Sequence, residues 1–411
     1  MRGRRRTERR RGLLLALAMV LGLPGIAAAQ TDSAVRRMAQ DLVPAVERAT
    51  GVTFRRPPRV AVRTRDQLGA YLEAKTRQEF SVAERRTQER VYKAFGVIAD
   101  SVNLLQTQLN LLQEQIAGFF DPDSGTLFVI RGGDAMMLRA VISHELVHAL
   151  QDQYMRLAPI LKMRRQNDRQ MAAQAILEGQ ATLAGILALT PGTSASQISQ
   201  SWGMLRQAVR AQAENASGAF GNAPRILRES LIFPYINGAE FMVFYEERRT
   251  SPDEMPYGER MPTTTEQILH PSRYTARETG LELAFARTRG DTVLYEDNFG
   301  EFEMKVILET WGLGEPDAIS AASGWNGDRY QVRGTRGGTV ILWAASFDSP
   351  QDAADFERHV RRVWERGRGR SQQGNRFSVE TRQVAGKPVV VLTDAPAGWA
   401  GWSSAPAVTG R

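Results

Sequence analysis

Two histidines and a glutamate stand close together in one short segment, His144-Glu145-Leu146-Val147-His148. On a helix, side chains four residues apart lie on the same face one turn apart, so both imidazoles can reach one metal ion. Neutral imidazole suits zinc, which takes a third protein ligand and leaves one position for water. Glu145, at the edge of that face, can take a proton from this water. The spacing therefore predicts a zinc site that activates water for attack on a carbonyl group.

The segment is informative because the chain has only four histidines, at positions 144, 148, 270 and 359. With so few, an HExxH pattern arises by chance with a probability on the order of a few in a thousand. The alternative interpretation is a pair of solvated or core histidines on an amphipathic helix. His359 lies in FERHVRRVWER, which predicts a solvated helix face.

A third ligand has to come from elsewhere in the chain, and the acidic candidates are Asp152, Asp168 and Glu178. Asp152 follows one turn later on the same helix. From there it is better placed to hydrogen-bond to a metal ligand than to bind the metal itself. Asp168 precedes a helix and is also explained by capping or a solvated loop. Glu178 lies in an almost wholly apolar helix, where a carboxylate is destabilising unless it is paired or metal-bound. We therefore expect the ligands to be His144, His148 and Glu178.

The segments HELVH and LEGQAT together resemble the gluzincin metallopeptidases, which are thermolysin-like in their active site. The resemblance is strongest over about residues 116–186. The flanking segments GFFDPDSGTLFV, HALQDQY, FPYINGAEF and TEQILHP also resemble a poorly characterised group of predicted exported bacterial metallopeptidases. A metzincin pattern is excluded, because Gln151 and Tyr154 stand where that class has glycine and histidine.

The resemblance implies zinc held by His144, His148 and Glu178, with Glu145 as general base. It also implies that the strand TLFVI, at 126–130, runs along the edge of the cleft and pairs with an extended peptide substrate. Gln180 departs from the pattern, since an acidic residue is common there; this puts the charge around the ligands in doubt, but not the ligand set.

Hydrolysis of a peptide bond also needs a donor to the oxyanion that develops on the substrate. The downstream candidates are Tyr235, His270, Arg329 and Tyr330. We favour His270, in EQILHPSRY, because the resemblance places this segment among the recurring motifs of the group. The alternative is a helix-end histidine fixed by a backbone hydrogen bond.

The elements that must position these residues follow from periodicity. Asp134 is a plausible N-cap for a helix over 135–155, and a second helix is predicted over 169–189. Helical spacing also runs from Ser81 to about Gln115. A strand at 339–346, a helix at 349–367 and a hairpin after it indicate a small α/β appendage. We predict an α+β fold: a mostly helical zincin-like core with a small twisted sheet at 30–289, the appendage at 290–398 and a flexible tail at 399–411.

The N-terminus has the pattern of a secretory signal. Arginines up to Arg11 precede an apolar run from Leu13 to Ile26, and Ala27-Ala28-Ala29 supplies a cleavage site. An uncleaved anchor is the alternative, but the run is short and broken by glycine and proline, whereas a membrane span needs about 20 apolar residues. We predict a cleaved signal peptide at 1–29 and export to the periplasm or the exterior, with no stable membrane span afterwards.

Composition narrows the class of protein further. There is no cysteine, which excludes disulfides, thiolate metal sites and a cysteine nucleophile. Without residues 1–29 the chain has 46 basic and 44 acidic residues, so bulk charge gives no case for nucleic acid. The leading hypothesis is a zinc peptidase acting on peptides or proteins. The alternatives are an inactive binding or scaffold protein of the cell envelope that keeps its zinc site, and a zinc hydrolase of a non-peptide amide.

Overall fold

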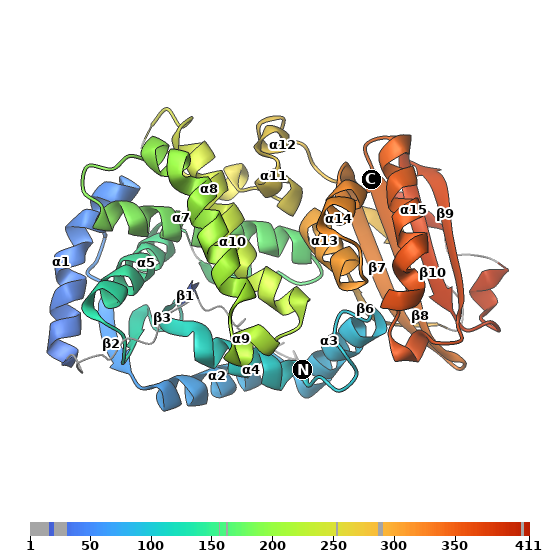
Figure 1. Ribbon diagram of the computed structural model, residues 1–411, viewed down its shortest axis with the longest axis horizontal. Helices are drawn as coiled ribbons and strands as arrows, with labels where there is room; N and C mark the ends of the chain where they lie inside the picture. The colour runs from blue at the N-terminus through green and yellow to red at the C-terminus, as the bar shows by residue number, and fades with distance from the viewer. Residues whose placement is uncertain are drawn as a thin grey trace, which may run out of the picture.

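The computed structural model describes residues 16–19, 31–155, 157–161, 163–251, 254–286, 291–403 and 407–411. Apart from Ala16–Met19, the segment predicted to be a signal peptide lies outside the described residues. Helices dominate and the strands form small sheets, so the predicted α+β class is confirmed. Figure 1 shows the first helix, α1 (Asp32–Thr50), at one end of the long axis and a strand-rich unit at the other.

The helices of the larger part are α1 (Asp32–Thr50), α2 (Arg65–Glu79), α3 (Val82–Ala94), α4 (Leu104–Gln115), α5 (Ala135–Tyr154), α6 (Leu157–Leu161), α7 (Asn167–Leu189), α8 (Ala195–Glu214), α9 (Gly218–Asn222), α10 (Arg225–Glu246), α11 (Thr265–Leu269) and α12 (Pro271–Thr275). Its strands are β1 (Ala16–Met19), β2 (Arg59–Arg63), β3 (Ile116–Asp121) and β4 (Thr126–Ile130). The remaining elements are β5 (Leu283–Phe285), β6 (Thr292–Asp297), α13 (Gly300–Thr310), α14 (Glu315–Ala322), β7 (Trp325–Thr335), β8 (Gly338–Phe347), α15 (Pro350–Gly367), β9 (Arg376–Val384), β10 (Lys387–Ala395) and β11 (Val408–Gly410).

The first sheet has the strand order β1-β3-β4-β2. β4 is the strand TLFVI, and it pairs parallel with β2 on one side and antiparallel with β3 on the other. TLFVI is therefore not the edge strand that the resemblance implied. Its neighbour β3 lies between β4 and the short β1, and β1, β3 and β4 all pack against α5.

The helical pattern from Ser81 to Gln115 is two helices and not one. α3 ends at Ala94, and Gly96 follows with a φ of 62°, a left-handed conformation that favours glycine. α4 begins only after Asn103, whose side chain accepts a hydrogen bond from the Gln106 N–H. Continuous apolar spacing concealed this break, because the buried residues of the connection keep the same hydrophobic character.

Three helices, α5, α7 and α10, form the centre of the larger part. α7 and α10 cross closely at Gly179 and Gly238, where a Cβ on Gly179 would lie 2.2 Å from the Gly238 carbonyl carbon. Only glycine at both positions permits this approach of the two backbones. Among the described residues, α7 is also the one helix whose length and hydropathy would suit a membrane span, but most of it is buried within the protein, as is usual for a core helix.

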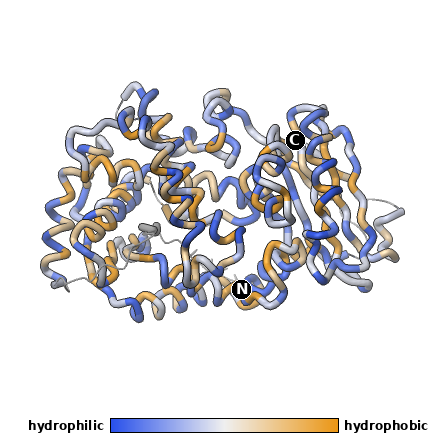
Figure 2. The backbone as a smooth tube through the Cα atoms, viewed as in Figure 1, coloured by the Kyte–Doolittle hydropathy of each residue, from blue (hydrophilic) through white to orange (hydrophobic). Residues whose placement is uncertain are grey.

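The strand-rich unit is an antiparallel sheet of order β6-β7-β8-β10-β9, against which α15 packs. Outer helices such as α1 and α15 show both colours of Figure 2 along their length, as amphipathic helices do, and their apolar residues are the buried ones. The predicted appendage is not separated from the core: the ring of Phe95, just after α3, packs edge-on against Phe299, Tyr330 and Trp343. The tail expected to be flexible includes β11, which pairs with β5.

Candidate metal centre

α5 presents the two histidines as its sequence predicts. The Asp134 carboxylate caps the helix by accepting the Met137 N–H at 2.8 Å. The helix then runs unbroken to Tyr154, which places His144 and His148 one turn apart. Both side chains are buried, and their rings meet edge to face with centroids 4.8 Å apart.

The two imidazoles converge with one carboxylate from α7. The Nε2 atoms of His144 and His148 lie 3.1 Å apart. Glu178 Oε2 lies 3.1 Å from the first of these nitrogens and 3.3 Å from the second. Two ligands of a tetrahedral zinc ion, each at about 2.0–2.1 Å, lie roughly 3.3 Å apart. The buried triad of His144, His148 and Glu178 could hold a metal ion, and its spacing fits one of that size.

The charges of the triad favour a cation. Burial raises the pKa of Glu178, but the two histidines outweigh burial and lower that pKa to about 2. Burial lowers the pKa of His148, but the Glu178 carboxylate outweighs it and raises the pKa to about 9. Burial also lowers the pKa of His144. Glu178 is therefore ionised at neutral pH, and the site favours a positive charge beside it, either a proton on His148 or a metal ion.

Gln151 is the residue that orients His148. It is fully buried, and its Oε1 lies 2.8 Å from His148 Nδ1. His148 Nε2 points toward His144 and Glu178. Nδ1 therefore carries the proton and donates it to Gln151 Oε1. Gln151 Nε2 in turn donates to the Leu177 carbonyl at 3.0 Å and to Gln180 Oε1 at 2.9 Å. Sequence reasoning did not assign this role; the available signal was a polar residue three positions after His148, next to the apolar Ala149 and Leu150.

Gln180 completes a neutral network around the ligands. Its Oε1 also accepts a hydrogen bond from the Tyr257 hydroxyl, and its Nε2 faces Met255 Sδ at 3.7 Å. Gln180 stands where the resemblance leads us to expect an acidic residue. The amide accepts from Gln151 as a carboxylate would, but it adds no negative charge beside Glu178.

Glu145 lies between α5 and β3 and is fully buried. A Cβ on Gly118 of β3 would lie 3.4 Å from Glu145 Cγ and only 2.5 Å from Val141 Cγ1. Gly118 therefore lets the backbone of β3 approach the glutamate closely. This arrangement puts Glu145 next to the triad on the side of the sheet.

Two cavities lie along α7 on either side of Glu178. One, of about 390 Å³, is bordered by His144 and by the α7 residues that follow Glu178. Its other walls are mostly apolar and come from α8 and α10: Trp202, Leu205, Val209, Ile232 and Ile236. The second, of about 640 Å³, is bordered by the α7 residues that precede Glu178 and has a more polar lining. His144 is the triad residue that borders the smaller cavity, and the lining of the larger cavity includes no triad residue.

Tyr235 on α10 is the oxyanion-donor candidate that the structure brings to the triad. Its ring stacks on that of His144, with centroids 5.8 Å apart and an interplanar angle of 22°. It also borders the smaller cavity together with His144. The close crossing at Gly179 and Gly238 brings this turn of α10 next to α7. In the sequence, the contact between Tyr235 and His144 is indicated only by these two glycines, which belong to helices far apart in the chain.

Two of the acidic ligand candidates have other partners. Asp168 Oδ1 accepts hydrogen bonds from Thr265 N at 2.9 Å and from Thr265 Oγ1 at 2.5 Å, so it fixes α11 to the start of α7. Asp152 Oδ1 lies 3.4 Å from Leu157 N, at the end of α5. The structure therefore selects Glu178 from the three candidates.

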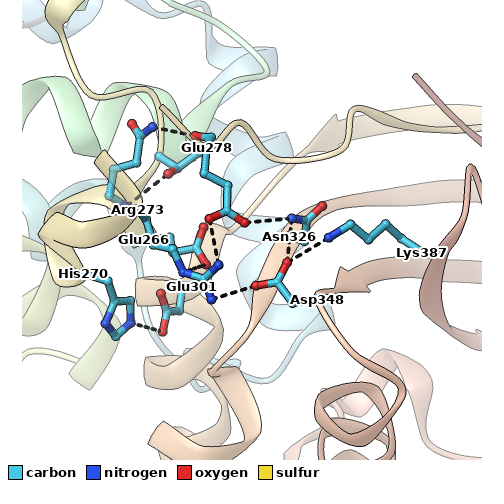
Figure 3. Close-up of polar contacts among 10 residues, drawn as sticks. Glu266, His270, Arg273, Glu278, Glu301, Asn326, Asp348 and Lys387 are labelled. Atoms are coloured by element: carbon cyan, nitrogen blue, oxygen red, sulfur yellow. Dashed lines mark hydrogen bonds and ion pairs between the residues drawn. The ribbon is translucent and has the colours of Figure 1, made fainter. Parts of the chain in front are cut away.

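His270 is engaged elsewhere. Its Nε2 bonds to Glu301 Oε1 of α13 at 2.9 Å, which raises the pKa of the imidazole. Figure 3 shows this pair beside a polar network in which Arg273 bridges Glu278 and Asp348. These contacts give His270 a structural explanation, and none of its contacts among the described residues is with the triad.

The remaining histidine and oxyanion-donor candidates also belong to other parts of the fold. Arg329 donates to the carbonyls of Leu283 and Arg165, and Tyr330 is buried against Phe299. His359 was predicted on a solvated face of its helix, but it is largely buried beside Arg358 and Arg362.

One part of the chain matches a known family model. Residues 287–405 match a model described as a domain of unknown function (DUF8575). This range covers the antiparallel sheet with α13, α14 and α15, and it overlaps the appendage predicted at 290–398. It does not include the triad. No curated protein and no solved structure matches the chain.

Proposed function

We propose that this protein is an exported zinc metallopeptidase of the gluzincin type that hydrolyses peptide bonds in peptides or proteins. One observation carries the proposal: two imidazole nitrogens and a carboxylate oxygen, from two different helices, converge within 3.3 Å. A ligand set of two histidines and one glutamate is a catalytic zinc set that leaves a position open for water. Glu145, which such a site would need as a base, stands next to the first ligand.

Each residue around the site has a part in the proposed reaction. The triad would hold a zinc ion, which would supply Lewis acidity toward the substrate carbonyl and would lower the pKa of water to about 7. Glu145 accepts the proton of the attacking water and passes it to the leaving amine. The Tyr235 hydroxyl donates a hydrogen bond to the oxyanion that develops on the substrate. Gln151 keeps His148 in the tautomer that leaves Nε2 free to bind the ion.

The shape of the site supports an extended substrate. The cavity bordered by His144 gives a bound peptide room for a side chain beside the triad. The smaller cavity beside His144 is walled mainly by apolar side chains. We therefore expect substrates with a large apolar side chain next to the bond that is cleaved.

Export is supported by the sequence of residues 1–29, with its basic start, apolar run and small-residue cleavage site. Export is also consistent with the absence of cysteine, because the folding of such a chain does not depend on the redox state of the compartment.

The proposal is tested by zinc content and casein hydrolysis of the chain 30–411, compared with the variant Glu145→Gln. The variant should keep stoichiometric zinc and lose hydrolysis by about 10²–10⁴-fold, because it keeps the ligands and removes the base. Glu73→Gln, an exposed glutamate on α2, is the matched control and should behave as wild type. Equal activity of Glu145→Gln and wild type would show that Glu145 is not the base. Zinc binding with no hydrolysis of any peptide would favour a scaffold protein, and hydrolysis of simple amides alone would favour a non-peptide amidase.

A further inference from the structure

One edge of the first sheet carries a strand that comes from the start of the chain. β1 pairs antiparallel with β3, with Leu17 opposite Phe119 and Met19 opposite Ile116. β1 is the outermost strand of this sheet, and without it β3 would present unpaired backbone groups along its length. Such an edge is the surface to which extended peptides bind by strand addition.

This edge lies beside the candidate metal centre. β1 contacts α5 and α7, the two helices that carry the triad, and Figure 1 shows it next to β3. The pairing is irregular between Leu17 and Met19, so the backbone of Ala18 stands opposite the stretch of β3 that contains Gly118. Gly118 is the position against which Glu145 packs. The backbone of the N-terminal segment thus runs past the proposed general base.

We propose that residues 16–19 occupy, within the same molecule, the edge of β3 to which a peptide substrate would bind, so that a chain retaining this segment is latent. The inference rests on the proposed function. The occupant is Ala-Leu-Ala-Met, an uncharged segment, and it meets a strand whose residues are all buried. Removal of the N-terminal segment would then expose the edge and activate the enzyme.

The tether makes this occupancy effective even if the segment binds weakly. Twelve residue steps separate Met19 from Thr31, where α1 is about to begin, and they can span at most roughly 40 Å. A linker of this length gives an effective concentration of about the millimolar range. A segment with a dissociation constant of about 0.1 mM would then lower kcat/KM by roughly tenfold or more.

The test compares three zinc-loaded chains in the same detergent buffer: 1–411, 30–411, and 1–411 with Ala18→Pro. Proline removes a backbone N–H and does not fit within a paired strand. Gly12→Pro in 1–411, outside the paired segment, is the matched control. The readouts are kcat/KM for an apolar quenched-fluorescence peptide and hydrogen exchange of the backbone amides in residues 116–121. The exchange measurement does not depend on catalysis.

We expect 1–411 and its Gly12→Pro control to be at least about tenfold less active than 30–411, with slow exchange in residues 116–121. Ala18→Pro should restore both the activity and the exchange to the level of 30–411. Equal activity and equal exchange in 1–411 and 30–411 would overturn the inference. If 30–411 binds no zinc and hydrolyses nothing, the proposed function fails, while equal exchange in 116–121 would by itself disprove the occupancy of β3 by the N-terminal segment.

Discussion

Replacing Gln151 by leucine should weaken zinc binding while leaving the three ligands in place. Gln151 is fully buried and links both ligand helices: it accepts from His148 Nδ1 on α5 and donates to the Leu177 carbonyl on α7. Leucine has a similar size but neither accepts nor donates a hydrogen bond. The substitution therefore leaves the His148 N–H without its acceptor and removes a polar link next to Glu178.

The size of the effect follows from these contacts. Loss of a group that orients a metal ligand typically costs 10–100-fold in metal affinity. This range corresponds to about 1.4–2.7 kcal/mol. We expect the upper half of the range, because Gln151 orients a histidine directly and also holds the residue that precedes the glutamate ligand.

The assay is competition for zinc between the protein and a chromophoric chelator, with the thermal unfolding of the metal-free form measured in parallel. The matched control is Gln153→Leu, two residues later on α5, whose side chain bonds to the backbone of Arg55 and Arg56 and not to the triad. The control should keep the wild-type Kd for zinc. If Gln151→Leu also kept that Kd, the role assigned to Gln151 in orienting His148 would be refuted.

Three further predictions concern residues of α10 and α7. Tyr235→Phe should keep zinc but lower kcat by about 10²–10³-fold, because it removes the proposed oxyanion donor; an unchanged kcat would exclude that role. Gly238→Ala would place a Cβ 2.0 Å from the Ala175 carbonyl oxygen and should destabilise the fold by about 1–3 kcal/mol in urea unfolding, whereas Gly203→Ala, with open space around it, should be neutral or stabilising. Burial raises the pKa of Asp168 to about 8, so the stability contributed by its neutral carboxyl is full below about pH 4 and is lost as the pH rises towards 8. Asp168→Asn, which stays neutral, should therefore gain thermal stability relative to wild type between about pH 5 and pH 8; a difference that does not vary with pH would contradict this.

Local patterns predicted the elements that carry the ligands. An N-cap aspartate, a helical spacing and two histidines four residues apart predict α5 and its metal-binding face together. Glu178 could be preferred over Asp168 because a carboxylate in an apolar helix needs a partner, and the structure supplies that partner in the two imidazoles. These inferences succeeded because each depends on the character of one helix.

The parts that sequence could not predict depend on how elements meet. Tyr235 reaches His144 only because two glycines allow α7 and α10 to cross closely, and no local pattern specifies that crossing. TLFVI and the preceding strand are both apolar, so the sequence does not reveal that β3, and not TLFVI, lies next to the edge strand β1. His270 was favoured from the resemblance, yet its environment is an ion pair with Glu301.

The central claim is that two imidazoles and a carboxylate bind one catalytic zinc ion, and the most direct measurement is the metal content of purified 30–411 by mass spectrometry. We predict one zinc per chain in wild type and in Glu145→Gln, and loss of bound zinc in His148→Ala. Wild-type protein that binds no stoichiometric metal, or a His148→Ala variant that retains it, would contradict the claim.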